Sequence, residues 1–267
     1  MYNFIDTNDS FVENKLPSEA LRINGVWLEE QIAGYRTLSV KGRESLSVDL
    51  TTFDDGRSNG VRFVRKRYPS REITVRYQLI ASTSEEFRES YNKLIALFDE
   101  ANQELVFNDE KAYFFTGTMS EMGSVPEGTN AVVSTITFSC LDPFKYELNY
   151  TVIEAEDTSS FDIDADIVAC SPCIVEIMPK ADMPDYAIQG LARDHMKDEL
   201  EEITIKNLKD ATPIIIDGEK QLITQLGMNK FNESRFWQYP TLTPGLNVVT
   251  TSRINAKITV KYRKRRL

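Results

Sequence analysis

One stretch near the middle of the chain constrains the fold more than any other. Residues 134–147 read STITFSCLDPFKYE, in which Ile136, Phe138 and Cys140 alternate with polar side chains. Period-two alternation of β-branched and aromatic residues predicts a strand with one buried face. The Asp-Pro pair that follows ends this strand, because proline has no N–H to donate to a strand ladder. We therefore expect one strand-rich domain to close here and another to begin.

The chain of 267 residues is long enough for two modest domains. We place an N-terminal domain at residues 1–147 and a C-terminal domain at residues 148–267. In the second domain, short strand patterns separated by turn signals predict a β-sandwich. The acidic residues 154–166 are expected to form a linker or an exposed edge, and residues 194–202 a short helical turn. The predicted fold class is mainly β with one α-helix.

That helix is predicted in the first domain, at about residues 83–101. Thr83 and Glu86 fit a capping box, and Ser82 with Glu85 fits equally well. The apolar residues that follow recur at helical spacing and form a single stripe: Phe87, Tyr91, Leu94, Ile95 and Phe98. Such a stripe is typical of a core face, so we expect the helix to pack on the N-terminal sheet.

The sequence before the helix predicts strands and one long loop. Asn24-Gly25 between apolar runs indicates a hairpin, because both central residues of that turn adopt positive φ. Residues 35–50 alternate like a strand, and residues 51–60 have the turn chemistry of a loop. The residues of this strand whose side chains we expect to face the core are Leu38, Val40, Leu46, Val48 and Leu50.

The basic run at residues 61–71 allows two interpretations. Its cations are either a nucleic-acid patch or, as is commoner, the solvated side of a strand pair: Arg62, Arg65, Lys66, Arg67 and Arg71. The formal net charge of −10 disfavours phosphate recognition by the molecule as a whole. We therefore expect no sequence-specific binding of nucleic acid.

Targeting signals are not recognisable in the sequence. No apolar run approaches the roughly 18–20 residues that span a bilayer, so we expect no membrane insertion. The N-terminus has neither the basic nor the apolar region of a secretion signal. Synthesis in the cytoplasm is the expectation.

Residues that carry catalysis or bind metals do not form a recognisable motif. Cys170 and Cys173 have the spacing of a redox or zinc site, but a strand pattern follows them where a redox pair needs a helix. Asp162-x-Asp-x-Asp166 departs from a calcium loop at its sixth and twelfth positions. His195 is the single histidine, and no G-x-S-x-G, P-loop, G-x-G-x-x-G or H-E-x-x-H occurs. We predict no catalytic, metal or cofactor site.

Two groups of residues in the second domain are candidates for surface contacts. Phe236, Trp237 and Tyr239 form either a platform for sugar stacking or part of the sandwich core, and the core is the commoner role. The C-terminal cations Arg263, Lys264, Arg265 and Arg266 either solubilise the last strand or pair with an acidic neighbour in an assembly. The sequence favours neither of these two.

These pieces together resemble the distal tail proteins of long-tailed phages (siphoviruses), mostly from phages and prophages of Gram-positive bacteria. The string ITFSCLDPFKY at residues 136–146 looks like the strand and Asp-Pro-Phe signature of that family. The other similar segments of the first domain are residues 21–28, 73–81, the helix start Ser82-x-x-Glu85, and 105–109. In the second domain they are residues 171–177, 203–207, 242–247 and 260–263.

The resemblance implies a structural protein rather than an enzyme. In that family six copies form a ring, with first domains around a central channel and galectin-like second domains outside. The ring connects the tail tube protein to the tail-tip hub protein of the baseplate, lets DNA pass, and can carry receptor-binding proteins. A homo-hexamer in the tail tip of the virion is the implied assembly. No insertion of about 100 residues for a further module is visible.

Two other classes of function remain open at this stage. One is a carbohydrate-binding module that recognises the host surface through the second domain and Trp237. The other is a cell-wall hydrolase, which would need an acidic pair or a metal site that the sequence does not single out.

Overall fold

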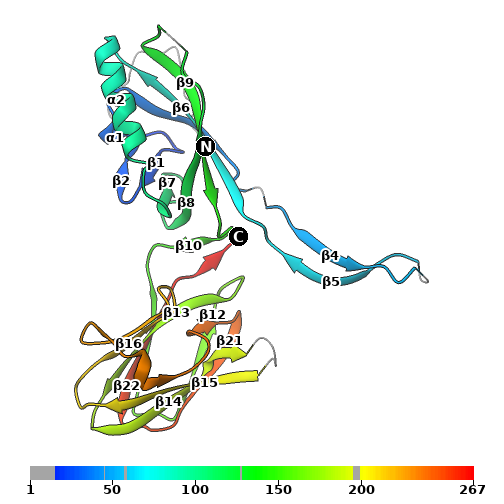
Figure 1. The fold of residues 1–267 in the computed structure, drawn as a ribbon, viewed down its shortest axis with the longest axis vertical. Coiled ribbons are helices and arrows are strands. Elements are labelled where there is room, and N and C mark those ends of the chain that lie inside the picture. The colour runs from blue at the N-terminus through cyan, green and yellow to red at the C-terminus, as the bar shows by residue number, and fades with distance from the viewer. Residues whose placement is uncertain (1–15, 45, 57–58, 127, 195–198) are drawn as a thin grey trace. The chain divides into compact units, whose positions relative to one another are not determined.

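The computed structural model describes residues 16–44, 46–56, 59–126, 128–194 and 199–267. It divides into two compact units, residues 1–145 with Leu267 and residues 146–266. Strands dominate both units and the first carries the main helix, which confirms the predicted fold class (Figure 1). The predicted domain boundary, after Glu147, lies next to the observed division.

The main sheet of the first unit is antiparallel. Its strands lie in the order β2 (Val26–Trp27), β1 (Leu21–Ile23), β7 (Gln103–Phe107), β8 (Tyr113–Met122), β9 (Ala131–Cys140), β6 (Arg71–Ile80) and β3 (Tyr35–Lys41). The turn between β1 and β2 has φ 46° at Asn24 and φ 88° at Gly25, which confirms the predicted hairpin. A four-residue helix, α1 (Leu28–Gln31), follows β2.

The ladder between β6 and β9 lies at the centre of this unit. Phe138 pairs with Ile73, and Ile136 pairs with Val75. These four side chains and that of Cys140 are fully buried. The alternation of residues 134–140 therefore forms the buried face that it predicts, and both neighbours in the ladder contribute to one core.

The helix α2 (Ser84–Ala96) packs its apolar stripe on this core. Thr83 and Glu86 form the capping box, which selects one of the two predicted caps. Phe87, Leu94 and Phe98 are buried as predicted.

Two features of the predicted helix are wrong. It ends before residue 101, because the N–H of Phe98 bonds to the carbonyl of Ile95 in a tighter last turn, and Asn102 then takes a positive φ that directs the chain into β7. Ile95 is 40% exposed, since it lies at the solvent edge of the stripe.

A second strand pair leaves the first unit between β3 and β6. β4 (Asp49–Phe53) and β5 (Arg62–Arg67) pair with each other and, among the described residues, with no other strand (Figure 1). Every residue of both strands is exposed, so Val48 and Leu50, which we expected to point inward, do not. The predicted loop at residues 51–60 is also too long, because β4 continues to Phe53. We call residues 49–67 the arm.

The second unit is a sandwich of two antiparallel sheets around one core. The first sheet has the order β11 (Thr151–Glu156), β22 (Ala256–Tyr262), β13 (Ser171–Pro179), β16 (Ile214–Asp217), β17 (Leu222–Gln225) and β18 (Met228–Asn229), and β20 (Thr241–Leu242) also pairs with β13. The second sheet has the order β12 (Ser160–Ala165), β21 (Gly245–Thr251), β14 (Met183–Asp194), β15 (Glu199–Leu208) and β19 (Ser234–Arg235). A short 3₁₀ helix, η1 (Phe231–Glu233), precedes β19, and β10 (Lys145–Glu147) pairs with β23 (Arg265–Arg266).

Two predicted segments of this unit can be compared with the structure. Residues 154–166 form β11 and β12, which are edge strands, so the prediction of an exposed edge is confirmed and that of a linker is wrong. Ala155, Ile163 and Ala165 are buried between their acidic neighbours. Of the residues 194–202 expected to form a short helical turn, Asp194 ends β14 and residues 199–202 belong to β15, whereas residues 195–198 lie outside the described residues.

Candidate functional site

The arm presents apolar side chains to solvent on a ribbon two strands wide. Leu50, Phe53 and Phe63 are 62%, 57% and 65% exposed. Leu50 lies opposite Lys66, and Thr52 lies opposite Phe63, so Leu50 and Phe63 share one face of the ribbon. Clusters of exposed apolar groups on a soluble protein mark surfaces that another molecule covers.

The root of the arm is held by a buried arginine. The guanidinium of Arg43 donates two hydrogen bonds to Asp109, at 2.6 and 2.8 Å, and one to Glu19 at 3.0 Å. It also lies over the ring of Phe107, 4.7 Å from the ring centre. Burial alone lowers the pKa of Arg43, but the hydrogen bonds and charge of Asp109 outweigh it and raise that pKa above its ordinary value. Arg43 is therefore a permanently charged anchor.

The other side of the root is fixed by Arg71 and Tyr68. Arg71 donates to the backbone carbonyl of Arg43 and lies over Phe115, 5.1 Å from the ring centre. Tyr68 packs edge-on against Phe144, with 5.6 Å between ring centres. Phe144 belongs to the Asp-Pro-Phe motif of the sequence. The motif therefore supports the arm as well as ending β9.

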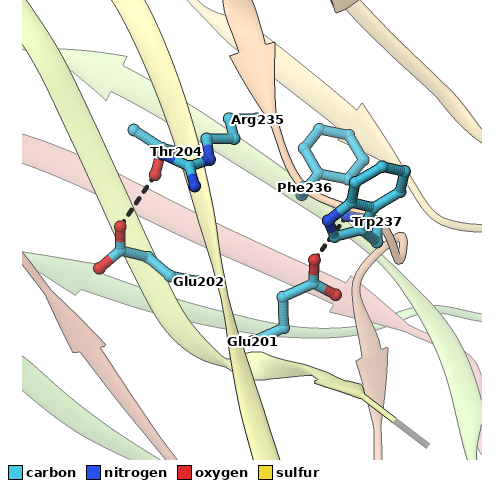
Figure 2. A pocket seen from close by; sticks show the side chains of 6 residues that line it. All are labelled: Glu201, Glu202, Thr204, Arg235, Phe236 and Trp237. Atoms are coloured by element: carbon cyan, nitrogen blue, oxygen red, sulfur yellow. Dashed lines mark hydrogen bonds between the residues drawn. The ribbon is translucent and has the colours of Figure 1, made fainter. Parts of the chain in front are cut away.

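A pocket of about 320 Å³ lies in the second unit, at the edge formed by β15 and β19. Thr204 on β15 pairs with Arg235 on β19, which brings two distant parts of the sequence together. Figure 2 shows the lining side chains, which are Glu201, Glu202, Thr204, Arg235, Phe236 and Trp237.

The three aromatic residues that the sequence singled out have different roles. Phe236 is buried, and its ring packs edge-on against Tyr239, with 5.1 Å between ring centres. Tyr239 is half-buried against the same core. Trp237, in contrast, is 94% exposed. Phe236 and Tyr239 therefore follow the core interpretation, and of the three only Trp237 presents its ring to solvent.

Two carboxylates shape the pocket, and the sequence did not single them out. Glu201 lies on the same face of β15 as the buried Ile203 and Ile205, so its side chain points inward. Its Oε1 accepts a hydrogen bond from the backbone N–H of Trp237, at 2.6 Å. Glu202 points to the other face and accepts the hydroxyl of Thr204 at 2.9 Å (Figure 2). The alternation around Ile203 and Ile205 could have predicted the directions of these two side chains. The pairing of β15 with β19 at Arg235 could not have been predicted from the sequence.

The C-terminal cations have partners inside the second unit. Arg266 contacts both oxygens of Asp166, at 2.9 and 2.5 Å, and Lys264 lies 3.7 Å from the same carboxylate. Arg263 lies over the ring of Tyr150, and Arg265 over that of Tyr146. The guanidinium of Arg266 lowers the pKa of Asp166. Contact of these cations with another protein stays a prediction.

The remaining polar motifs form no reactive centre among the described residues. Cys170 is exposed, whereas Cys173 is buried and burial raises the pKa of its thiol. Groups of three His, Cys, Asp or Glu side chains that could hold a metal ion are absent from the described part of the chain. His195 lies outside the described residues. No described helix combines the length and apolar character needed to cross a membrane.

Comparison with known proteins relates the first unit to phage tail proteins. Residues 28–140 match the family model described as the phage tail protein RIFT-related domain. No curated protein matches the sequence at a significant level.

The whole chain has the fold of a distal tail protein. It is similar to the Dit protein of phage SPP1, described as a hub adsorption apparatus of phages that infect Gram-positive bacteria, with a TM-score of 0.76. That match has 15% identity and covers 93% of this chain and 99% of the other. A chain of the phage P2 baseplate in its activated conformation with Ca is similar over 87% of this chain and 91% of its own, with a TM-score of 0.57 and 13% identity. The resemblance seen in the sequence is thus confirmed.

Proposed function

We propose that this protein is a structural component of the tail tip of a long-tailed phage. Six copies form a ring that connects the tail tube protein to the tail-tip hub protein, and DNA passes through its channel. The tail protein domain at residues 28–140 and the similarity to SPP1 Dit over 93% of the chain support this role. Receptor-binding proteins dock on the periphery of such a ring. The protein acts in the virion and is not an enzyme.

The exposed arm is the feature that best supports assembly into a ring. It exposes Leu50, Phe53 and Phe63 on strands whose outer edges pair with nothing in the described residues. An exposed apolar ribbon with open edges favours association with another chain. Arg43 and Arg71 hold the chain on either side of the arm, so docking does not have to order the root of the arm.

Charge indicates that the partner of the arm is another copy of the chain. Residues 49–67 include five basic and three acidic residues, whereas the whole chain has a net charge of −10. A basic arm is therefore attracted to the acidic remainder of a neighbouring copy. An arm that docks on a different surface of the next copy makes a head-to-tail contact, and such contacts form a ring when the rotation from copy to copy closes. A net charge of −10 also suits a channel that does not retain DNA.

Light scattering coupled to size exclusion, with negative-stain images of the peak, tests this function. We expect a mass of about 183 kDa for six copies of the 30.5 kDa chain, and rings with six-fold symmetry. Since assembly can depend on neighbouring tail proteins, the measurement is repeated with the tail tube and hub proteins of the same phage. A monomer under both conditions contradicts the ring.

Arm variants separate assembly from folding. Leu50→Ser with Phe63→Ser is expected to shift the ring to monomers, because the docking surface becomes polar. Leu226→Ser is the matched control, since Leu226 is an exposed apolar residue of the second unit at 74% exposure. Circular dichroism should be unchanged in both. Rings that persist in the arm double variant would remove the arm from the interface.

A further inference from the structure

We propose that the pocket at β15 and β19 binds a neutral saccharide, with one pyranose ring stacked on the indole of Trp237. The site lies outside residues 28–140, which match the tail protein domain. It does not depend on ring assembly. The argument rests on the side chains that line this pocket.

Trp237 is placed as a stacking surface. Among the described residues it has the largest exposed fraction of any large apolar side chain, 94%. Tryptophan is highly buried on average, so an indole exposed to this extent is available to stack against a ligand. The neighbouring Phe236 is buried in the core, and the N–H of Trp237 is bonded to Glu201 at 2.6 Å. The backbone is thus held while the ring faces solvent.

Polar groups beside the indole suit sugar hydroxyls. Arg235 forms no ion pair or side-chain hydrogen bond with another described residue, and its planar guanidinium presents several N–H donors. Glu202 uses one carboxylate oxygen for Thr204, and its other oxygen remains an acceptor. A hydroxyl both donates and accepts, so adjacent hydroxyls of a pyranose match a carboxylate and a guanidinium together. The stacked ring would present its C–H face to the indole.

Pocket size and charge narrow the ligand to a neutral sugar. The volume of about 320 Å³ lies in the range of ~300–1,000 Å³ typical of small-ligand sites. Glu201 and Glu202 supply two negative charges against the single positive charge of Arg235. Phosphate or carboxylate groups on a glycan therefore meet a net negative lining, and we expect hexoses and N-acetylhexosamines to be preferred over acidic sugars.

A glycan array followed by calorimetry tests the proposal. The full chain is applied to immobilised neutral hexose, N-acetylhexosamine, uronic acid and phosphorylated glycans, and the best neutral ligand is then titrated in solution. We expect retention on neutral glycans and weaker or no retention on acidic ones. No retention of any neutral glycan by the folded protein overturns the proposal, as does a preference for acidic glycans.

Matched variants locate the binding. Trp237→Ala is expected to weaken binding at least tenfold, Trp237→Phe less, and Arg235→Ala several-fold. Leu246→Ala is the control, because Leu246 is 64% exposed on β21 and outside the pocket, and it should bind as the wild type does. Circular dichroism confirms that each variant is folded. Unchanged sugar binding by the Trp237→Ala variant overturns the proposal. A variant that binds sugar normally but fails to bind another tail protein overturns it as well.

A spectroscopic readout assigns the contact to the indole itself. The chain has two tryptophans, so Trp27→Phe leaves Trp237 as the single emitter. Its fluorescence should shift to shorter wavelength as the neutral sugar saturates the site, because the ring leaves water. Binding by calorimetry without such a shift would place the sugar elsewhere and overturn the assignment.

Discussion

Two strand pairs of the first unit both contain large apolar side chains but have opposite environments. In the ladder of β6 and β9, alternate residues are buried and share one core. In the arm, each residue of β4 and β5 is exposed, although Leu50, Phe53, Phe63 and Val64 are as apolar as the core strands. Strand propensity therefore explains both pairs, but the free energy of burial has been gained only in the ladder. The apolar area of the arm remains available for association.

The largest difference is expected between core and arm truncations. Phe138→Ala should lower the free energy of unfolding by about 3–5 kcal/mol, because Phe138 is fully buried and packs edge-on against Phe98. Phe63→Ala should change the free energy of unfolding of the monomer by less than about 0.5 kcal/mol. Urea unfolding of both variants as monomers measures the contrast. A comparable loss in Phe63→Ala would mean that the arm is already packed in the monomer.

The root of the arm should behave like the core. Arg43→Met should cost about 3 kcal/mol, because it leaves the carboxylates of Asp109 and Glu19 without their cation in a part-buried site. The double variant Arg43→Met with Asp109→Leu should lose less than the single one, since it leaves fewer unpaired charges. Urea unfolding again provides the measurement. A single variant as stable as the wild type would show that the root is not anchored by this pair.

Cys140 on β9 makes the core sensitive to alkali in a way that the arm is not. Burial raises the pKa of its thiol to about 11, from an ordinary value of 9.0. Between pH 9 and pH 11, the thiol therefore keeps its proton in the folded state but loses it in the unfolded chain. This contribution to stability is complete below pH 9 and is lost as pH rises to 11, about 1–3 kcal/mol in all.

Comparison with a variant isolates the effect of this thiol. Unfolding free energies of wild type and Cys140→Ala are measured from pH 8 to 11, and the wild type should lose its advantage progressively across that range. Parallel curves for the two proteins would contradict a raised pKa at Cys140.

The smallest energetic effect is expected from a reporter on the arm. Leu50→Cys should leave the unfolding free energy within about 0.5 kcal/mol and introduce a thiol that reacts as fast as the exposed Cys170 in the monomer. In the ring its reaction should slow toward that of the buried Cys140, because a neighbouring copy covers it. Thiol labelling followed by mass spectrometry resolves the three sites. Equal labelling of the introduced thiol in ring and monomer would leave the arm outside the interface.

Local patterns predicted the elements whose cause is local. The hairpin at Asn24-Gly25, the capping box at Thr83, and the strand through Phe138 depend on turn geometry, a cap and alternation within a few residues. The end of the helix was missed because the apolar stripe continues to Phe98, whereas the last turn tightens at Ile95 and Asn102 takes a positive φ. Residues 154–166 were left open between a linker and an exposed edge, because small and acidic residues give a weak strand signal until partner strands supply the ladder.

The candidate sites divide in the same way. Local patterns in the sequence were sufficient to predict a mainly β chain with one helix, the family resemblance, and Trp237 as a candidate contact residue. The exposure of Leu50, the burial of Ile136, and the position of Arg235 beside Glu202 and Thr204 became visible only in the folded chain. Alternation shows which side of a strand is apolar, whereas burial depends on whether another part of the chain covers that side.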